Sequence, residues 1–334
     1  MSNTIKEETA KPAHSPGALH RRSKREAQRK RKCLIAWIAM VAGGLLLVAI
    51  LAIVITGWKF ISNINHKIAF SDLQMKDLTE VLVEPESPDD PYYFLLIGSD
   101  SRDPDTDAGR SDTIILARID PVANTVSLLS IPRDTKIMLE GYGTQKINAA
   151  LEHYGPAGAV KAVSELCDVD IAHFAEIDFQ GLINLVDRLG GVEVNVPVDI
   201  RLKEDFIPKG KQHLNGYQAL VMSRCRNFPD GDFTRMKNQR VLLQAIMKKL
   251  LLSNKTELPD LITELADYVK TDVSATKAIS LLLKLQSVDA DSTIYMATVP
   301  SYTSNQEGVS YVVIDWEAFT FMMERFKAGL PPEE

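Results

Sequence analysis

The chain has 334 residues, of which 45% are hydrophobic and 25% charged, with a net charge of −6 and three cysteines. The first 32 residues hold ten Lys or Arg against three Glu, a charge of +7, so the remainder carries −13. An acidic domain is a poor general nucleic-acid binder, because such binding depends on neutralising phosphates. Three cysteines provide neither a disulfide framework nor a zinc site of several thiolates. We therefore expect a domain with a substantial core and no nucleic-acid partner.

An apolar run of 23 residues without charge, Cys33–Ile55, follows the basic stretch. As a helix it would measure about 35 Å, enough to cross a bilayer. The positive-inside rule leaves the basic tail in the cytoplasm and places everything after Trp58 outside. A cleaved signal peptide is the alternative, but the run is too long for one and lacks a small-x-small cleavage site at its end. The sequence therefore predicts a single-pass protein of the cell membrane.

Four segments follow from these patterns: a basic cytoplasmic tail at 1–32, a transmembrane helix at 33–57, an extracellular stalk at 58–90 and a folded domain at 91–334. The stalk is predicted because its amphipathic character fades into an acidic, proline-rich stretch, 84–91, that does not continue a helix.

Strand and helix patterns alternate along the folded domain. Strands are predicted at Tyr92–Ile97, Thr113–Ile119, Thr125–Ile131, His173–Ile177, Val192–Val196, Thr293–Thr298 and Ser310–Ile314. Helices are predicted at Asn148–Tyr154, Ala157–Leu166, Phe179–Leu189, Asp232–Leu252, twice within 258–286, and from Asp315. This alternation predicts an α/β fold, a three-layer α-β-α domain around a central mixed sheet.

Polar residues concentrate in four places where a predicted strand ends or a helix begins. They are Gly98–Arg102, Gly109–Thr113, Pro132–Asp134 with Lys146 and Asn148 following, and the segment from Arg224 to Arg240. Ligands of open α/β sheets usually bind at strand ends. Each cluster taken alone is also what helix caps, turns and surface arginines produce.

Helix geometry distinguishes these readings for the fourth cluster. At 100° per residue, Asp232, Arg235 and Gln239 fall on one stripe, which continues into apolar residues such as Leu243 and Met247. Charged groups that face a core are costly unless a ligand or partner satisfies them. The N-terminus of a helix also favours an anion. We therefore expect a polar pocket at this end of the helix.

The residue types indicate the ligand. The cations are mostly arginine, which suits bidentate phosphate contacts; they are Arg110, Arg133, Arg224, Arg226 and Arg235. Asp100 and Asp112 on adjacent loops would hold Mg²⁺ (or Mn²⁺) together with phosphate oxygens. The sequence has no P-loop, no Gly-x-Ser-x-Gly elbow and no His pair with metal-ligand spacing.

Because a domain outside the membrane meets little ATP, a lipid-linked pyrophosphate is the expected donor. Aliphatic residues near the arginines, among them Leu182, Leu185, Leu243 and Met247, could line a tunnel for its tail or belong to an ordinary core.

From Tyr92 to the C-terminus the chain closely resembles the LytR-CpsA-Psr family of membrane-anchored cell-wall ligases. The resemblance rests on motifs in one order: Gly98-Ser99-Asp100-Ser101-Arg102, Gly109-Arg110-Ser111-Asp112-Thr113, Ser130-Ile131-Pro132-Arg133-Asp134, Lys146-Ile147-Asn148-Ala149-Ala150, Val186-Asp187-Arg188-Leu189-Gly190-Gly191-Val192-Glu193-Val194, His213-Leu214-Asn215-Gly216, Arg224-Cys225-Arg226, Gly231-Asp232-Phe233-Thr234-Arg235 and Gln239-Arg240.

The resemblance implies transfer of a glycopolymer phosphate from undecaprenyl pyrophosphate to a peptidoglycan sugar hydroxyl. It assigns Mg²⁺ to Asp100 and Asp112, and a candidate role in orienting or deprotonating the acceptor to Asp232. Residues that would bind the pyrophosphate or support it are Arg110, Arg133, Lys146, Arg224, Arg226, Arg235, Gln239 and Arg240. The partners implied are the polyprenyl-linked donor, the peptidoglycan acceptor and the membrane.

Two positions depart from the family pattern. Asn238 stands where the family often has Arg, and Thr234 replaces a common Gly. By helix phase we expect Asn238 to lie off the inward stripe.

Three other functions remain open: a hydrolase of the same donor, a non-catalytic binder of polyprenyl phosphate, and a DNA-binding regulator acting through the basic tail. The sequence also leaves open one disulfide between Cys167 and Cys225, the alternative being two small buried thiols.

Overall fold

The structure is a computed structural model, and it describes residues 59–100, 109–229, 232–252, 254, 256–285 and 294–332. The chain divides into two compact units, Met1–Phe60 and Ile61–Glu334. The basic tail (1–32) and the apolar run lie outside the described residues. Within the described ranges no helix has both the length and the apolar character needed to span a bilayer. The fold below is that of the second unit.

In the described part of this unit, the central sheet has six strands in the order β11-β6-β1-β2-β3-β12. Their bounds are β1 Tyr92–Ser99, β2 Ser111–Asp120, β3 Thr125–Ile131, β6 Ile171–Ile177, β11 Val269–Thr271 and β12 Ile294–Thr298. β1 pairs with β6 and β3 with β12 in parallel, whereas the β1–β2, β2–β3 and β6–β11 pairs are antiparallel. The predicted central mixed sheet is therefore confirmed, with β11 as an edge strand that the sequence analysis did not predict.

Among the described residues, four two-stranded ribbons accompany the sheet. They are β4 (Lys136–Leu139) with β5 (Gly143–Lys146), β7 (Val192–Val196) with β10 (Gly210–Leu214), β8 (Ile200–Leu202) with β9 (Asp205–Ile207), and β13 (Ser301–Gln306) with β14 (Val309–Ile314). All of these strands are only three to six residues long, and most of their sequences alternate weakly, so only β7 and β14 were predicted.

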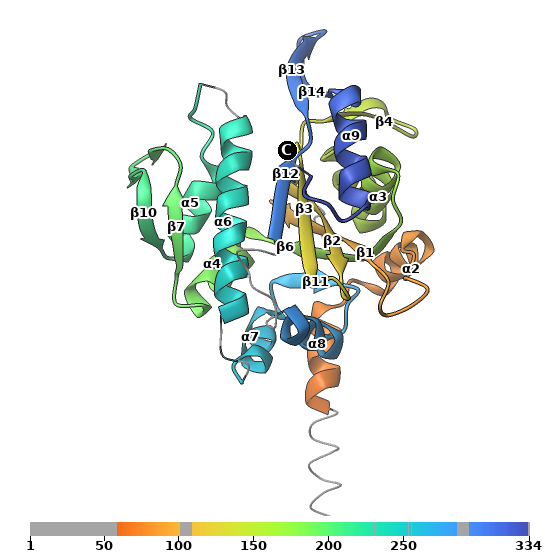
Figure 1. The fold of residues 1–334 in the computed structure, drawn as a ribbon, viewed down its shortest axis with the longest axis vertical. Coiled ribbons are helices and arrows are strands. Elements are labelled where there is room, and N and C mark those ends of the chain that lie inside the picture. Colours follow the sequence, from red (N-terminus) through yellow and green to blue (C-terminus); the bar gives the residue numbers. More distant parts are fainter. Residues whose placement is uncertain are drawn as a thin grey trace, which may run out of the picture. The chain divides into compact units, whose positions relative to one another are not determined.

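Helices cover both faces of the sheet (Figure 1). Their bounds are α2 Asp72–Val81, α3 Ala149–Cys167, α4 Phe179–Arg188, α5 Gly216–Arg224, α6 Asp232–Leu252, α7 Leu258–Leu265, α8 Ala275–Leu285 and α9 Trp316–Lys327. α3 and α9 lie on one side of the sheet and α6 on the other, followed by α4 and α5 (Figure 1). α3 covers both of the helices that were predicted on either side of Gly155. Non-helical backbone angles at Gly155, followed by Pro156, produce a kink between them.

Three apolar clusters hold these layers together. The largest lies between the sheet and α2, α3 and α9. A second joins the other sheet face to Leu243 and Met247 of α6. A third lies on the far side of α6, where Leu242 and Ile246 pack with α4, α5, β7 and β10. α6 is therefore covered on two sides, a point that matters for its polar residues.

Residues 61–90 do not form the free stalk that the sequence predicted. Leu78 of α2 is fully buried in the largest cluster, together with Phe70. Ile64 and Ile68 pack on Ala266 and Ala275. The acidic Pro-rich stretch does end the helical pattern, but the amphipathic residues before it supply part of the core. The folded unit thus begins before residue 91.

Cys167 and Cys225 do not form the disulfide that the sequence left open. Both are free and buried. Cys167 belongs to the cluster beneath α3, and Cys225 to the cluster beyond α6. They lie on opposite sides of the sheet and serve as small core residues.

Candidate functional site

The first part of the site, called here the sheet half, consists of Asp100, Asp112 and Arg133 at the ends of β1, β2 and β3. β1 and β2 are antiparallel and Ser99 pairs with Ser111, so Asp100 directly follows the end of β1, while Asp112 lies in the register shift between Ser111 and Thr113. The amide of Asp100 donates to the carbonyl oxygen of Arg110 over 3.2 Å, and Asp100 Oδ1 accepts from the amide of Arg110 at 2.7 Å. Backbone pairing therefore holds the two predicted metal-binding carboxylates at one edge of the sheet.

Asp112 is the centre of the charge cluster. Its Oδ1 accepts a short hydrogen bond from Nη1 of Arg133, which follows β3. The same oxygen lies 3.6 Å from Nη2 of Arg226, which follows α5. Asp112 and Arg133 are 17% and 15% exposed, so this ion pair is partly shielded from solvent, whereas Arg226 is 49% exposed. Three residues predicted from distant motifs thus meet.

Asp134 extends this cluster toward Lys146 and was not assigned a role from sequence. Its Oδ1 lies 3.3 Å from Nζ of Lys146 and 3.8 Å from Nε of Arg133. Its carbonyl accepts from the amide of Val312 at 2.8 Å, which ties the cluster to β14. The Pro-Arg-Asp sequence was a signal for this residue, because an acid beside a phosphate-binding arginine sets the arginine's orientation.

The second part of the site, called here the helix half, consists of Arg224, Arg226, Arg235 and Gln239 on α5, the segment after it, and α6. The guanidinium of Arg224 lies 4.8 Å from the ring centre of Phe179, a cation–π contact with the start of α4. Gln239 Nε2 donates to the carbonyl of Ser223 at 3.0 Å, so α6 is fixed to the end of α5. Arg235 in the first part of α6 is 1% exposed. Asp232 begins α6, and its side chain lies outside the described part of the structure.

The predicted inward stripe of α6 is confirmed for Arg235, Met236 and Ile246, which are buried, while Lys237 is exposed. The prediction for Asn238 is wrong. Asn238 is fully buried, and its amide nitrogen and oxygen have no hydrogen-bond partner among the described residues. The physical reason is that α6 packs on two sides, so its buried arc is wider than the single stripe used for the prediction.

Two predicted residues point to other partners. Arg110 binds Glu152 of α3, with Nε 2.6 Å from Oε2, and this contact raises the pKa of Arg110 and lowers that of Glu152. Arg240 donates to Thr298 Oγ1 of β12 at 3.4 Å. These two arginines connect the site to α3 and to the sheet edge.

A buried carboxyl lies on the sheet near the site and was not predicted. Glu176 of β6 is 4% exposed, and its register partner is Ile97 of β1. Burial raises the pKa of Glu176 to about 7, with Asp178 adding to the rise and the Ser99 hydroxyl opposing it. No sequence signal marks it, because the strand reads as ordinary alternation.

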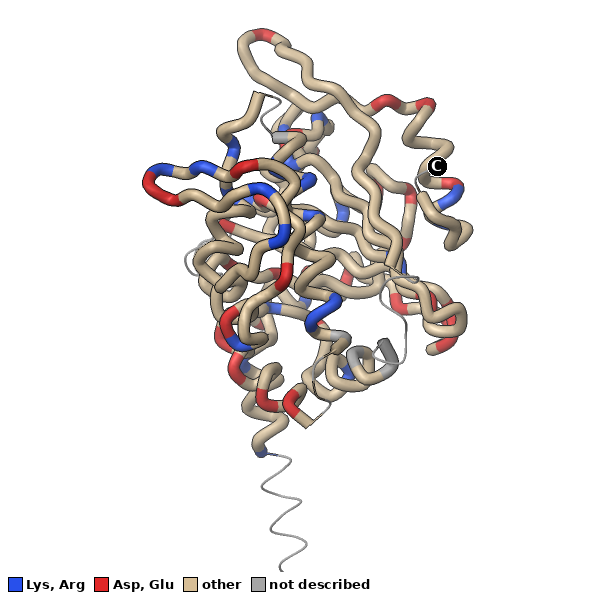
Figure 2. Tube along the Cα trace, turned by 60° about the vertical axis from the view of Figure 1, so that its left-hand side comes forward, with Lys and Arg blue, Asp and Glu red and all other residues tan. Residues whose placement is uncertain are grey.

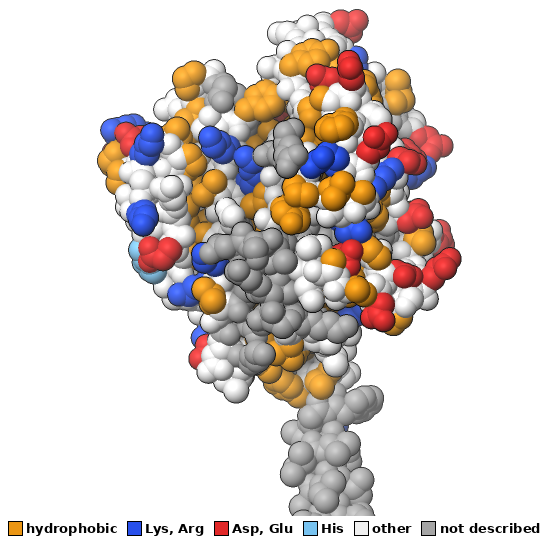
Figure 3. Space-filling view, in the orientation of Figure 1, with side chains coloured by type: hydrophobic (Ala, Val, Ile, Leu, Met, Phe, Trp, Pro, Cys, Tyr) orange, Lys and Arg blue, Asp and Glu red, His pale blue; other side chains and the backbone are white. Residues whose placement is uncertain are grey.

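The charge balance favours a phosphorylated ligand. Five cations, Arg133, Lys146, Arg224, Arg226 and Arg235, face three acids, Asp100, Asp112 and Asp134. Figure 3 shows Lys and Arg side chains gathered across the upper part of the face between the α6 side and the β13–β14 side. In Figure 2 a group of Lys and Arg positions lies in the upper middle of the view, with Asp and Glu spread over outer loops.

The residues present fit a magnesium ion shared with a ligand. In the described ranges no three His, Cys, Asp or Glu side chains converge as a closed metal cage. Mg²⁺ is commonly bound by one or two carboxylates and completed by substrate phosphates and water. Asp100 is exposed and Asp112 faces Arg133 and Arg226, so the donor set is two carboxylates beside arginines, which is the chemistry of an ion completed by phosphate and water.

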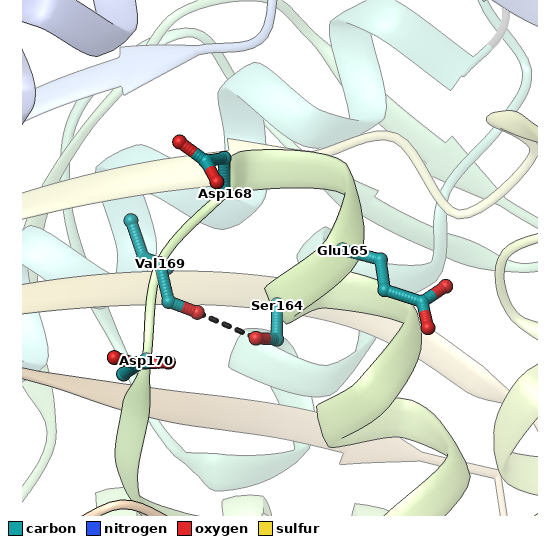
Figure 4. Close-up of a pocket in the computed structure, with 5 residues that line it drawn as sticks. All are labelled: Ser164, Glu165, Asp168, Val169 and Asp170. Carbon is teal, nitrogen blue, oxygen red and sulfur yellow. Dashed lines mark hydrogen bonds between the residues drawn. The ribbon is translucent and has the colours of Figure 1, made fainter.

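A pocket at the end of α3 also gathers acidic residues, and its arrangement differs from that of the candidate site. It is lined by Ser164, Glu165, Asp168, Val169 and Asp170 at the end of α3. The carboxylates diverge, and the visible bond joins Ser164 Oγ to the carbonyl of Val169 (Figure 4). Asp168 binds Lys327 at 2.8 Å. Lys327 pairs with one of these acids alone, whereas the candidate site brings several arginines to one carboxylate.

Comparison with known proteins supports the same reading of the fold. The LytR_cpsA_psr family model matches residues 59–328. A relative from Enterococcus faecalis, named polyisoprenyl-teichoic acid–peptidoglycan teichoic acid transferase TagU, is 30% identical over 293 residues, 86% of this chain and 95% of its own. A TagU from Bacillus cereus is 35% identical over 212 residues, 63% of this chain and 68% of its own. The crystal structure of Bacillus subtilis TagV has a TM-score of 0.66 and 26% identity, covering 73% of this chain and 98% of that one.

Proposed function

Because this chain belongs to the LytR-CpsA-Psr family, we propose that it transfers a glycopolymer phosphate from a polyprenyl pyrophosphate donor to a sugar hydroxyl of peptidoglycan. The observation that carries the proposal is the meeting of Asp112 with Arg133 and Arg226. A carboxylate held between two arginines from separate segments forms a site that two phosphates and a cation can share. The relatives named as teichoic acid transferases support a wall glycopolymer as the group transferred.

In the proposed reaction the acceptor hydroxyl oxygen attacks the phosphorus attached to the glycopolymer. The bond from this phosphorus to the bridging oxygen breaks, and the polyprenyl phosphate leaves. Arg133 and Arg226 bind the phosphate oxygens on which charge builds up, and Arg224 and Arg235 hold the pyrophosphate from the helix side. Asp232 is the proposed acceptor of the hydroxyl proton, because it begins the helix that carries Arg235 and Gln239.

A magnesium ion held by Asp100 and Asp112 would neutralise pyrophosphate charge when bound. The two residues differ in what they do without it. Asp112 orients Arg133, whereas Asp100 fixes the backbone of Arg110. The Arg110–Glu152 pair then links this edge to α3. These contacts keep the phosphate-binding groups in place before a donor arrives.

The proposed location is the outer face of the cell membrane. The uncharged run at 33–57 is the proposed anchor, with the basic tail in the cytoplasm, and both rest on the sequence patterns. A tethered domain meets a lipid-linked donor in the same plane, which explains why the chain needs no soluble energy source.

The test uses the full chain in detergent with a lipid-linked glycopolymer pyrophosphate and peptidoglycan fragments. We expect a covalent product whose mass is that of the fragment plus the glycopolymer phosphate less one water, formed by the wild type and by Lys237→Ala, whose side chain is exposed on α6. Arg226→Ala should form much less. Release of free glycopolymer phosphate in place of the conjugate would identify a hydrolase and overturn the transfer step.

A further inference from the structure

An aromatic cluster lies beside the site and takes no part in the function proposed above. It consists of Tyr142, in the turn between β4 and β5, with His153 and Tyr154 of α3. The rings of Tyr142 and His153 stack with centroids 3.9 Å apart and planes inclined by 13°. Tyr142 and Tyr154 meet edge to face at 5.6 Å. Yet Tyr142 is 48% and Tyr154 45% exposed, so about half of each surface remains open to a partner.

The backbone presents this cluster in one geometry. Gly141 and Gly143 have φ of +72° and +71°, the left-handed conformation that a tight hairpin turn needs and that glycine adopts without strain. The amide of Tyr142 donates to the carbonyl of Leu139 at 3.0 Å, and the Tyr154 hydroxyl donates to that of Glu140 at 2.6 Å. A half-exposed ring fixed in this way loses little conformational freedom when a ligand covers it.

Two connections join the cluster to the candidate site. His153 follows Glu152, whose carboxylate binds Arg110 beside Asp100. Tyr142 is followed by β5, which ends at Lys146, and Lys146 lies 3.3 Å from Asp134. Four residues of strand span about 13 Å. The aromatic surface therefore lies within a few sugar lengths of the phosphate-binding residues.

The charges around the cluster are paired, so they give a polyanion no net attraction and suit a neutral ligand. Glu152 is neutralised by Arg110, and Glu140 lies 3.2 Å from Lys161. The donor brings phosphates, which these acids do not attract, whereas sugar rings present an apolar C–H face that covers an aromatic ring. The surface thus differs in character from the arginine-rich helix half.

We propose that Tyr142, His153 and Tyr154 form the binding surface for the sugar rings of the peptidoglycan acceptor, with Tyr142 as the principal stacking ring. The inference rests on the proposed transfer reaction, in which a glycan strand must approach the phosphate-binding residues from a side that the donor leaves free. Binding here positions the acceptor hydroxyl without contributing a group to the chemistry. It makes Tyr142 a determinant of acceptor affinity.

The test compares Tyr142→Ala and Tyr142→Phe in the full chain, with acceptor varied at saturating donor. We expect Tyr142→Ala to raise the KM for peptidoglycan fragments about five- to tenfold, the size of one aromatic stacking contact, with kcat and the donor KM unchanged. Tyr142→Phe keeps the ring and should behave as wild type. The matched control is Tyr217→Ala, since Tyr217 is 54% exposed at the start of α5, at the opposite end of that helix from Arg224.

A second measurement separates this inference from the transfer reaction. The full chain without donor is sedimented with purified peptidoglycan sacculi, and we expect Tyr142→Ala to lower the bound fraction relative to wild type and Tyr217→Ala. Absence of conjugate from the wild type would count against the proposed function, while sedimentation would still report on the aromatic surface. An unchanged acceptor KM and unchanged sedimentation in Tyr142→Ala would overturn the inference, as would an effect confined to the donor KM.

Discussion

In the sheet half of the site the charged side chains are paired with one another, whereas in the helix half the exposed guanidinium groups keep much of their surface open. Asp112 holds Arg133 within a partly buried pair, while Arg226 reaches the same carboxylate at 3.6 Å with 49% of its side chain exposed. Arg224 contacts only a ring face in the described structure, apart from backbone bonds. A paired half stays rigid without ligand, and an open half retains the positive charge that attracts a donor. The division suggests that the first organises the reacting centre and the second captures the pyrophosphate.

The largest effect on the transfer activity is expected from a substitution in the sheet half, at Asp112. Asp112→Asn keeps the shape but removes the charge that would hold a cation and orient Arg133. We expect kcat/KM for transfer to fall about a thousandfold, since a bound metal supplies several kcal/mol of charge stabilisation. The measurement is conjugate formation with and without EDTA. Asp168→Asn is the control, because Asp168 is an exposed acid at the far end of α3 that pairs with Lys327.

If Asp112→Asn kept wild-type activity in the presence of EDTA, the metal assignment to Asp100 and Asp112 would be wrong. The sheet half would then serve only to orient Arg133.

Glu176, which lies on β6 beside the sheet half, should make the free energy of unfolding of the domain depend on pH. Its pKa is raised from 4.5 to about 7. Below pH 4.5 both folded and unfolded chains carry the proton, so the group has no effect. Between pH 4.5 and 7 the unfolded chain loses the proton first, so the free energy of unfolding falls as pH rises, by on the order of 3 kcal/mol in all, and stays low above pH 7.

Glu176→Gln removes this titration. We expect the variant to gain stability over wild type at pH 8 and little at pH 4, as measured by urea unfolding across the range. Glu165→Gln is the control, since Glu165 is 65% exposed on α3. A slope of unfolding free energy against pH that Glu176→Gln leaves intact would show that another group is responsible.

The helix half should control donor affinity. Arg226→Ala removes an exposed guanidinium and should weaken binding of a lipid pyrophosphate by roughly 1.5–3 kcal/mol, the contribution of a charged hydrogen bond. Arg224→Ala should act in the same direction. Lys237→Ala, on an exposed face of α6, should bind the donor as wild type does.

Equal losses from Lys237→Ala and Arg226→Ala in a direct binding assay would mean that the positive field, and not the position of the guanidinium, decides affinity. The contrast between the two halves would then lose its basis.

The sheet half was easier to predict than the helix half, for a physical reason. β1, β2 and β3 read as buried strands with polar residues at their ends, and strand ends of one sheet lie together, so the juxtaposition followed from the pattern. The structure matches β3 at both ends, Thr125–Ile131. On α6 the single inward stripe predicted the burial of Arg235 but not that of Asn238. The sequence pattern of one helix does not show on how many sides other elements pack against that helix.

Other features depended on contacts between segments far apart in the chain. Glu152 became a site residue only through its contact with Arg110. The residues before 91 were read as a stalk because no local signal shows that Leu78 enters the core of a domain that begins later in the chain. Short ribbons such as β8–β9 carry too few alternating residues to be recognised.

The smallest effect is expected at Cys225, which lies between the two arginines of the helix half. Its thiol donates to the carbonyl of Arg201 over 3.3 Å and is fully buried, so it supports the arginines through packing. Cys225→Ala should lower the free energy of unfolding by about 1 kcal/mol through a small cavity and one lost weak bond, with donor affinity nearly unchanged.

Cys167→Ala, in the cluster beneath α3, is the matched control for stability. Burial raises the pKa of the Cys167 thiol to about 12, which keeps this thiol unreactive. Alkylation of the denatured, unreduced chain followed by peptide mapping should label both thiols. A Cys167–Cys225 bridge in that map would contradict the structure and would mean that a covalent link, in place of packing, anchors the segment that carries Arg224 and Arg226.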